Sequence, residues 1–439
     1  MEHLAGQRQS QTLAPMLYYA RGSKDDCITG DEVRDILARV FGSLGERRKV
    51  LAIPPDFTRF NSYAGPITEM VYDYYGEALT DIMPALGTHS PMTDAQIETM
   101  FGHTPKGLFR VHDWRNDVVT VGEVPAGYVR KVSEGRVDYP WPAQVNKLLL
   151  DPSYDLILSI GQVVPHEVIG MANYTKNIFV GVGGSMGINR SHYLGATYGM
   201  ERIMGRAMSP VRDVMEYARV NFIKDLPIVY IQTVLSKDAE GRLRLRGLFI
   251  GDDFECFRRA AELSLETNFI MVEKPVRKCI VWLDPEEFKS TWLGNKAIYR
   301  TRMALADGAE LIVLAPALKE FGEDPVIDAL IRKYGYKGTD RTLEATRANL
   351  DLQENLGASA HLIHGSSEGR FNISYCPGPG ISRGEIESVG YNWCNLEETM
   401  ARYGVNGLKD GWNVVNGEEI YYISNPALGL WAHPDRFKQ

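Results

Sequence analysis

The sequence has little cysteine and no long hydrophobic run. Only five of its 439 residues are cysteine, the five are scattered, and no two form a C-x-x-C pair. This pattern argues against a disulfide framework and against a thiolate zinc site. No stretch approaches the ~18 uninterrupted apolar residues of a membrane helix, and the first residues are polar and acidic, unlike a secretion signal. We therefore expect a cytoplasmic protein with no membrane partner.

Clusters of basic residues are also missing. The net charge is −8, and no Lys/Arg-rich run or basic stripe beside aromatic residues is present. Such a charge distribution repels a phosphate backbone, so nucleic acid is not expected as a partner. Capture of a small acid would instead depend on individual arginines or lysines inside a pocket.

The sequence does contain short aliphatic runs that alternate with helical patterns. The runs occupy residues 49–53, 83–86, 156–160, 177–182, 279–283, 310–315 and 419–424. This alternation is typical of α/β proteins with mainly parallel sheets. The length suggests two domains at roughly 100–200 residues each, and the polar break Glu273-Lys274-Pro275 precedes a fresh strand. We predict α/β domains at 1–274 and 275–439, with an active-site cleft between them.

Local signals predict where some helices begin and end. Thr93 and Gln96 form a capping box, and Gly102 is placed as the stop of that helix. The segment 284–287, Asp-Pro-Glu-Glu, predicts another helix start. The glycine-rich segment 181–187 reads G-x-G-x-x-x-G, which is not the dinucleotide fingerprint. It predicts a turn with positive φ, with a small anion-binding nest as the alternative.

Reactive side chains follow several of the predicted strands. Asp56, Thr58 and Arg59 come after the run 49–53, and His89 comes after 83–86. His166 follows 156–160, and the glycine-rich segment leads to His192. Because ligands of open α/β sheets bind outside the carboxyl ends of the strands, we expect these side chains at one rim.

Each of these residues also has an ordinary structural interpretation. A single loop histidine is usually a surface or hydrogen-bonded residue, and Asp56 with Arg59 could be a structural ion pair. His112 does not follow a strand, and we interpret it as structural. Lys176 precedes the apolar run 177–182, where partial desolvation would make it a nucleophile. The alternative for Lys176 is an exposed lysine at a strand edge.

The spacing of these positions resembles the nickel-pincer-nucleotide-dependent lactate racemase family. Lys176 stands ten residues after His166 and sixteen before His192, and the elements Asp56-x-Thr58-Arg59 and Gly87-Thr88-His89 accompany them. The motifs are clear over roughly residues 45–200 and fainter beyond.

The resemblance implies a role for each position. Lys176 would carry the cofactor, a nickel pyridinium-3,5-bisthiocarboxylic acid mononucleotide, through a thioamide, and His192 would ligate the nickel. His89 and His166 would be the acid/base pair. Arg59 would support the substrate, and Asp56 and Arg59 would contact the cofactor. Proteins of cofactor biosynthesis would then be partners during maturation.

The resemblance extends to the second domain through Lys296, at the position of the family's carboxylate-binding lysine. It stands on a predicted helix beside Trp292, which would also contact substrate; alternatively, Lys296 only extends its stem over apolar surface. The implied reaction is inversion of C2 of a 2-hydroxy acid by hydride transfer to and from the cofactor. A neutral imidazole suits the accompanying proton transfer near neutral pH.

Three departures from the lactate-type pattern concern the substrate pocket. Residues 171–175 read Met-Ala-Asn-Tyr-Thr in place of a Ser-Gly-Gly-like stretch, Ser90 replaces an arginine, and Trp292-Leu293 replaces a Tyr-Gln pair. We therefore expect a substrate other than lactate, such as a longer or sugar-derived 2-hydroxy acid.

Two other functions fit the same residues. Three histidines could hold zinc for a hydrolase, although no H-E-x-x-H helix is present. A non-catalytic protein could also capture a small acid with Arg59 and Lys296.

Overall fold

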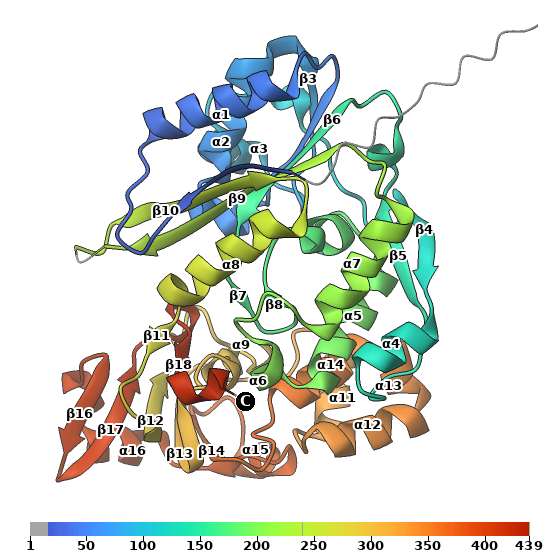
Figure 1. The fold of residues 1–439 in the computed structure, drawn as a ribbon. Coiled ribbons are helices and arrows are strands. Elements are labelled where there is room, and N and C mark those ends of the chain that lie inside the picture. The colour runs from blue at the N-terminus through green and yellow to red at the C-terminus, as the bar shows by residue number, and fades with distance from the viewer. Residues whose placement is uncertain (1–15, 239, 439) are drawn as a thin grey trace, which may run out of the picture.

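The computed structural model describes residues 16–238 and 240–438 and contains two six-stranded sheets, one above the other in Figure 1. The polar N-terminal segment, on which the expectation of no secretion signal depends, lies mostly outside the described residues. Among the described residues, no helix is both long enough and apolar enough to cross a membrane.

The first sheet is built from residues before 252. In spatial order its strands are β1 (Leu17–Gly22), β10 (Leu243–Gly251), β9 (Ile228–Lys237), β6 (Leu156–Gln162), β2 (Val50–Ile53) and β3 (Leu79–Ile82). The last four are parallel, whereas β10 and β1 run antiparallel to their neighbours.

The second sheet follows the predicted break at residues 273–275. Its order is β15 (Asn392–Trp393), β14 (Asn372–Pro377), β13 (Leu305–Ala315), β12 (Val276–Trp282), β17 (Glu418–Ile423) and β16 (Gly411–Val415). Only β16 is antiparallel to its neighbour. The predicted α/β class with mainly parallel sheets is therefore confirmed, while the division into domains at residue 274 stays a prediction.

Helices cover both faces of the first sheet. They are α1 (Gly30–Leu44), α2 (Ala64–Tyr75), α3 (Asp94–Phe101), α4 (Ala126–Val132), α5 (Ser185–Tyr198), α6 (Met200–Ile203), α7 (Pro210–Phe222) and α8 (Phe254–Asn268). Neighbouring strand residues point to opposite faces, so Ala52 packs on the α1 and α2 side and Leu51 on the side of α7 and α8. Burial on both faces explains why these strands read as continuous aliphatic runs.

We call the residues up to 274 the first part of the chain and the residues from 275 on the second part. The helices of the second part are mostly short. They are α9 (Thr291–Gly294), α10 (Lys296–Tyr299), α11 (Pro325–Tyr334), α12 (Thr339–Ala348), α13 (Leu350–Glu354), α14 (Leu356–His364), α15 (Arg383–Ser388) and α16 (Leu396–Tyr403). Helix α14 packs against α5, so the two parts meet along these helices (Figure 1).

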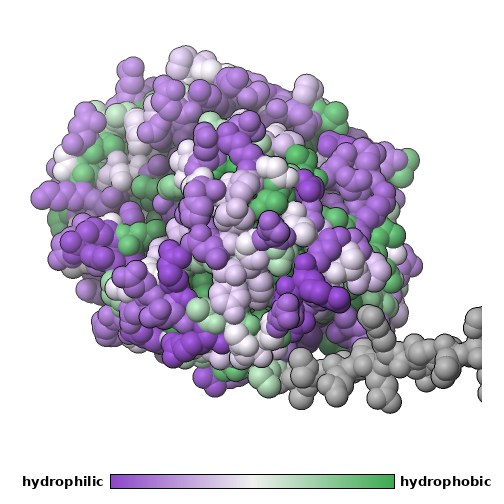
Figure 2. All heavy atoms as spheres, turned by 90° about the horizontal axis from the view of Figure 1, so that it is seen from above, coloured by the Kyte–Doolittle hydropathy of each residue, from purple (hydrophilic) through white to green (hydrophobic). Residues whose placement is uncertain are grey.

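Small two-stranded sheets complete the fold. They pair β4 (Val118–Val124) with β5 (Trp141–Asn146), β7 (Pro165–His166) with β8 (Gly170–Met171), and β11 (Ile270–Met271) with β18 (Trp431–Ala432). The face in Figure 2 carries mostly hydrophilic side chains, with hydrophobic ones scattered among them.

The helix signals read from the sequence have mixed outcomes. The capping box of Thr93 and Gln96 is present at α3, and Gly102 is its C-cap, as predicted. The helix predicted to start at Asp284 is wrong, because the segment forms a turn in which Asp284 accepts from the Glu286 and Phe288 N–H groups. The next helix, α9, starts at Thr291 and is capped by Ser290.

Candidate active site

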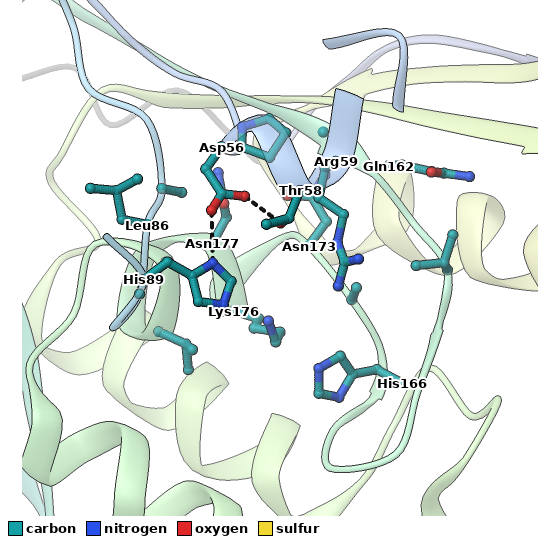
Figure 3. A pocket seen from close by; sticks show the side chains of 18 of the residues that line it. Asp56, Thr58, Arg59, Leu86, His89, Gln162, His166, Asn173, Lys176 and Asn177 are labelled. Atoms are coloured by element: carbon teal, nitrogen blue, oxygen red, sulfur yellow. Dashed lines mark hydrogen bonds and ion pairs between the residues drawn. The ribbon is translucent and has the colours of Figure 1, made fainter. Parts of the chain in front are cut away.

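The predicted site residues of the first part line one pocket of about 330 Å³. This pocket lies outside the carboxyl ends of β2 and β6, where a ligand site of an open α/β sheet is expected. Figure 3 shows His89 and His166 on either side of Lys176. The predicted residues in its lining are Asp56, Thr58, Arg59, His89, His166, Lys176 and His192.

Asp56 fixes the orientation of His89. A bridge between Pro55 and Ala85 joins the loops that carry them, and His89 Nδ1 lies 2.7 Å from Asp56 Oδ2. Thr58 donates to the other carboxylate oxygen at 2.5 Å. Burial opposes ionisation of Asp56, but the hydrogen bonds from His89 and Thr58 prevail and lower its pKa. The ionised carboxylate accepts the Nδ1 proton, so Nε2 of His89 is left free to take a proton.

His166 has the opposite arrangement of ring nitrogens. It lies in the β7–β8 hairpin, where the Val168 N–H donates to its Nδ1 at 3.1 Å. The neutral ring therefore carries its proton on Nε2. Burial outweighs the nearby Glu167 charge and holds the pKa of His166 well below its usual value. The pocket thus contains one imidazole ready to accept a proton and one ready to donate a hydrogen bond.

A strained loop precedes Lys176. Asn173 and Tyr174 both have left-handed backbone, with φ of 67° and 59°, which is unfavourable for side chains other than glycine. The buried Arg212 on α7 holds the loop by donating to the Met171 carbonyl at 2.7 Å, the Asn173 carbonyl at 3.2 Å and Thr175 Oγ1 at 2.7 Å.

Lys176 itself is placed in a setting that favours the neutral amine. Burial lowers its pKa to about 8, and the positive charge of Arg59 acts in the same direction. A neutral amine is the form that attacks an acyl carbon. The partial desolvation of Lys176 that the sequence predicts agrees with the structure.

The strand predicted at 177–182 is wrong. Residues Asn177–Gly181 form a single turn of π-helix, and Lys176 is its N-cap. A short buried apolar run gives the same periodicity signal in either structure. The strand predicted at 83–86 is also misplaced, because β3 ends at Ile82.

The positive-φ turn predicted at 181–187 is also wrong, since none of its glycines has positive φ. These glycines instead permit close contacts. A Cβ atom on Gly183 would lie 2.0 Å from the Phe179 carbonyl oxygen, and one on Gly184 would lie 2.5 Å from Gln144 Oε1.

His192 stands on α5 rather than on a loop. Its Nδ1 donates to the Ile188 carbonyl at 2.8 Å, one helical turn earlier. This bond leaves Nε2 with a free lone pair, the form in which an imidazole binds a metal. Burial lowers the pKa of His192 and so favours the same neutral form.

A metal held by protein side chains alone finds no support here. Within residues 16–238 and 240–438, no group of three or more His, Cys, Asp or Glu side chains is arranged to hold a metal ion. The zinc alternative needs such a convergence of histidines. His112, interpreted as structural, is buried, and its ring nitrogens contact the Gly183 carbonyl and the Asn146 amide.

Three polar residues of the pocket were not singled out from the sequence. Glu167 lies beside His166, and although burial opposes its ionisation, the charges of His166 and Arg300 lower its pKa. Asn177 anchors the π-helix to the sheet through the Ile53 carbonyl and Ser159. Asn173 is buried, and its Nδ2 has no hydrogen-bond partner among the described residues. The only sign of these three residues in the sequence is that each is polar and stands close to a residue already predicted to be functional.

The predicted residues of the second part lie apart from this pocket. Lys296, on α10, has its Nζ 3.4 Å from Glu287. The Trp292 ring lies 4.3 Å from that of His361. Neither residue lines the pocket that contains Lys176.

Comparison with known proteins agrees with this arrangement. Residues 38–203 match the sequence profile of the lactate racemase N-terminal domain, a span that contains every predicted residue of the pocket. Residues 38–203 of the chain therefore form a domain of the lactate racemase family. No curated protein matches the sequence.

Two solved structures share the fold of this chain. A crystal structure of a protein from Thermotoga maritima has a TM-score of 0.71 and 22% identity, covering 92% of this chain and 98% of the other. The lactate racemase apoprotein from Thermoanaerobacterium thermosaccharolyticum has a TM-score of 0.68 and 16% identity, with 94% of each chain covered.

Proposed function

We propose that the protein is a racemase or epimerase that inverts C2 of a 2-hydroxy acid with a nickel-pincer nucleotide attached to Lys176. The observation that carries the proposal is a partly buried lysine with a pKa of about 8 in one pocket with two histidines of opposite tautomer. The match of residues 38–203 to the lactate racemase N-terminal domain supports the same reaction class.

The side chains fit the proposed cofactor. Lys176 would supply the amine for a thioamide, and Nε2 of His192 would supply one ligand to nickel, which accepts imidazole nitrogen. Nδ2 of Asn173, which has no partner among the described residues, is a buried donor that a bound group would satisfy. The chemistry that the bound cofactor would supply is reversible acceptance of hydride from C2. Cofactor-biosynthesis proteins are proposed as partners in loading.

The two histidines have different roles toward the substrate hydroxyl. His89 takes the hydroxyl proton at Nε2, and Asp56 stabilises the imidazolium that forms. The Nε2–H of His166 donates a hydrogen bond to the same oxygen from the other side, and the His89 imidazolium returns its proton to that oxygen when hydride comes back to C2. The flat keto acid between the two half-reactions can accept hydride on either face.

Arg59 is the proposed partner of the substrate carboxylate. It lines the pocket, and within the described residues it forms no ion pair of its own. Lys296 and Trp292 are proposed as further substrate contacts, which requires the second part to approach the pocket more closely. Because the departures from the lactate-type pattern include Ala172 and Asn173, which line the pocket, we propose a longer or sugar-derived 2-hydroxy acid rather than lactate.

Metal analysis and intact mass test the attachment. Protein made in cells that synthesise the nickel cofactor is expected to carry about one nickel per chain, with a covalent increment on Lys176. Lys176→Ala should lose both, and His192→Ala should lose nickel while keeping the increment. An adduct mapped elsewhere, or zinc as the only metal, would overturn the proposal.

Isotope labelling tests the hydride step. Substrate carrying deuterium at C2 should return most of the label to product, because the hydride does not exchange with water. Rapid loss of the label to solvent would mean proton abstraction at carbon. Binding of 2-hydroxy acids without any turnover by nickel-loaded protein would indicate the non-catalytic alternative.

A further inference from the structure

A second cavity lies on the other side of the helix that carries His192. Its volume is about 710 Å³, within the range of small-molecule sites, and larger than that of the pocket around Lys176. It is bounded by residues 135–139, by the first half of α5, and by α12, α13 and the start of α14. It therefore spans the junction between the two parts of the molecule.

Helix α5 separates the two cavities. Ile188 and His192, one turn apart, face the pocket that contains Lys176. Asn189, Arg190 and Tyr193 of the same helix line the second cavity. Since side chains at these positions project from different sides of a helix, a ligand in the second cavity would not overlap with one bound at Lys176.

The second cavity is rich in donors for an anion. Arg190 and Arg347 line it, and within the described part of the chain neither forms an ion pair with a carboxylate. Arg190 donates one hydrogen bond to the Pro140 carbonyl and lies over the Tyr139 ring. A third lining arginine, Arg136, pairs only with the exposed Asp340 at 3.3 Å. The carboxylates in the lining are Asp138, which pairs with Arg130 outside it at 3.5 Å, and the exposed Glu354.

The first turn of α5 adds to the positive potential. Ser185 and Met186, the first two residues of this 14-residue helix, line the cavity, and the N-cap Gly184 offers no side chain to their N–H groups. Free N–H groups at a helix N-terminus bind anions well, especially phosphates. The two arginines without carboxylate partners are an independent observation that points to the same kind of ligand.

The rest of the lining is aromatic and apolar. Tyr139 and Tyr193 have ring centroids 6.5 Å apart, and the Met186 side chain is 49% exposed. Leu343 and Leu356 line the cavity from the opposite side. Such surfaces accept the flat body of a ligand whose charged end is held by arginines.

We propose that this cavity binds a phosphate monoester that carries a planar ring, such as a nucleoside monophosphate. The phosphate sits between Arg190, Arg347 and the N-terminus of α5, and the ring packs against Tyr139 and Met186. A ligand so placed contacts both parts of the chain along the helix that carries His192.

Calorimetric titration of the full-length protein with adenosine monophosphate tests this site. Saturable binding is expected, and adenosine and inorganic phosphate, which each lack one half of the ligand, should bind at least about tenfold more weakly. Arg347→Gln should weaken binding by about tenfold or more, because a charge-assisted contact to phosphate is lost. Arg190→Gln gives a second, independent test of the same anion contact.

Two control variants locate the binding. Arg341→Gln lies on α12 like Arg347, outside this cavity, and should leave the affinity unchanged. Arg59→Gln should also leave it unchanged, whereas binding in the pocket around Lys176 would make it weaken. Absence of binding, equal affinity for adenosine, or an unaltered affinity in Arg347→Gln would overturn the proposal, whatever the outcome for the racemase activity.

Discussion

At the scale of single residues, the difference between His89 and His166 arises from their neighbours. Asp56 accepts the Nδ1 proton of His89, whereas the backbone N–H of Val168 donates to Nδ1 of His166. The same side chain is therefore presented in two tautomers. Mutating the group that bonds to Nδ1 therefore tests the tautomer while the histidine itself stays in place.

Asp56→Asn should impair the proton transfer at His89. An amide has nearly the same shape as the carboxylate but neither its charge nor its two acceptors, so the His89 imidazolium loses its stabilisation. We expect turnover to fall by about 10²-fold or more, while nickel and the Lys176 adduct are retained. Steady-state kinetics of nickel-loaded protein measures this, and Asp113→Asn, at a half-buried aspartate outside the pocket, is the matched control. Unchanged turnover would remove Asp56 from the mechanism.

Lys176→Met should stabilise the protein before cofactor attachment. With a pKa of about 8 in the folded chain, against about 10.4 when unfolded, Lys176 is protonated at neutral pH at a cost in stability of up to roughly 3 kcal/mol. The unfolded chain binds this proton more tightly, so the cost is complete below pH 8 and disappears between about pH 8 and pH 10.4. Urea denaturation of both variants at pH 7 and pH 10 measures it. A gain equal at both pH values would contradict the lowered pKa.

At the scale of elements, the loop of residues 171–176 is held by a helix distant in sequence. Arg212 lies 36 positions after Lys176 in the chain and still makes the hydrogen bonds that fix the left-handed residues Asn173 and Tyr174. A fully buried arginine is costly unless its donors are used. Its role is to position the loop rather than to contact a substrate.

Arg212→Met should therefore loosen the loop. Removing the guanidinium leaves two backbone carbonyls and Thr175 Oγ1 without their donor, which costs roughly 2–5 kcal/mol of stability. At a temperature where the variant is still folded, we expect a lower yield of the Lys176 adduct, measured by intact mass. Arg212→Lys should recover part of that yield. Arg219→Lys, on the same helix and paired with Glu216, is the control. A full adduct yield in Arg212→Met would mean that the loop needs no such support.

The elements also show how far the sequence can be interpreted. The strands at residues 50–53 and 156–162 were predicted well, because strands buried on both faces are uniformly aliphatic. The π-helix after Lys176 has the same aliphatic character and could not be distinguished from them. The residues of the first part were found through motif spacing. The role of Arg212 was not, since hydrogen bonds between distant segments leave no local pattern.

At the scale of the whole molecule, a buried cluster of charges joins the two parts. Glu201 on α6 accepts from Arg302 at 2.9 Å and lies 3.0 Å from Arg370. Arg302 is only 3% exposed. Burial opposes ionisation of Glu201, but the charges of Arg302 and Arg370 prevail and lower its pKa.

Glu201→Gln should weaken the junction between the parts. It leaves two arginines without their shared carboxylate, and we expect a loss of about 3–5 kcal/mol in the free energy of unfolding at pH 7. The lowered pKa of Glu201 means that its contribution is present above the unfolded value near 4.3 and is lost as the pH falls through the folded value. The difference between wild type and variant should therefore shrink in acid. Denaturation at pH 7 and pH 3 measures this, and a constant difference would contradict the lowered pKa.

The pairing of β18 with β11 has a consequence for how the chain is made. Trp431 and Ala432 lie beside Ile270 and Met271, and Ala432 also bridges to Met303, so residues synthesised late complete the contact between segments made well before them. The strands of the first sheet all lie before residue 252, and α8, which packs on one of its faces, follows directly, so this sheet can form during synthesis. A nascent chain thus passes through a stage in which the residues around Lys176 are folded but the second part does not yet pack against them. We expect this interval to offer a loading protein its widest access to the amine.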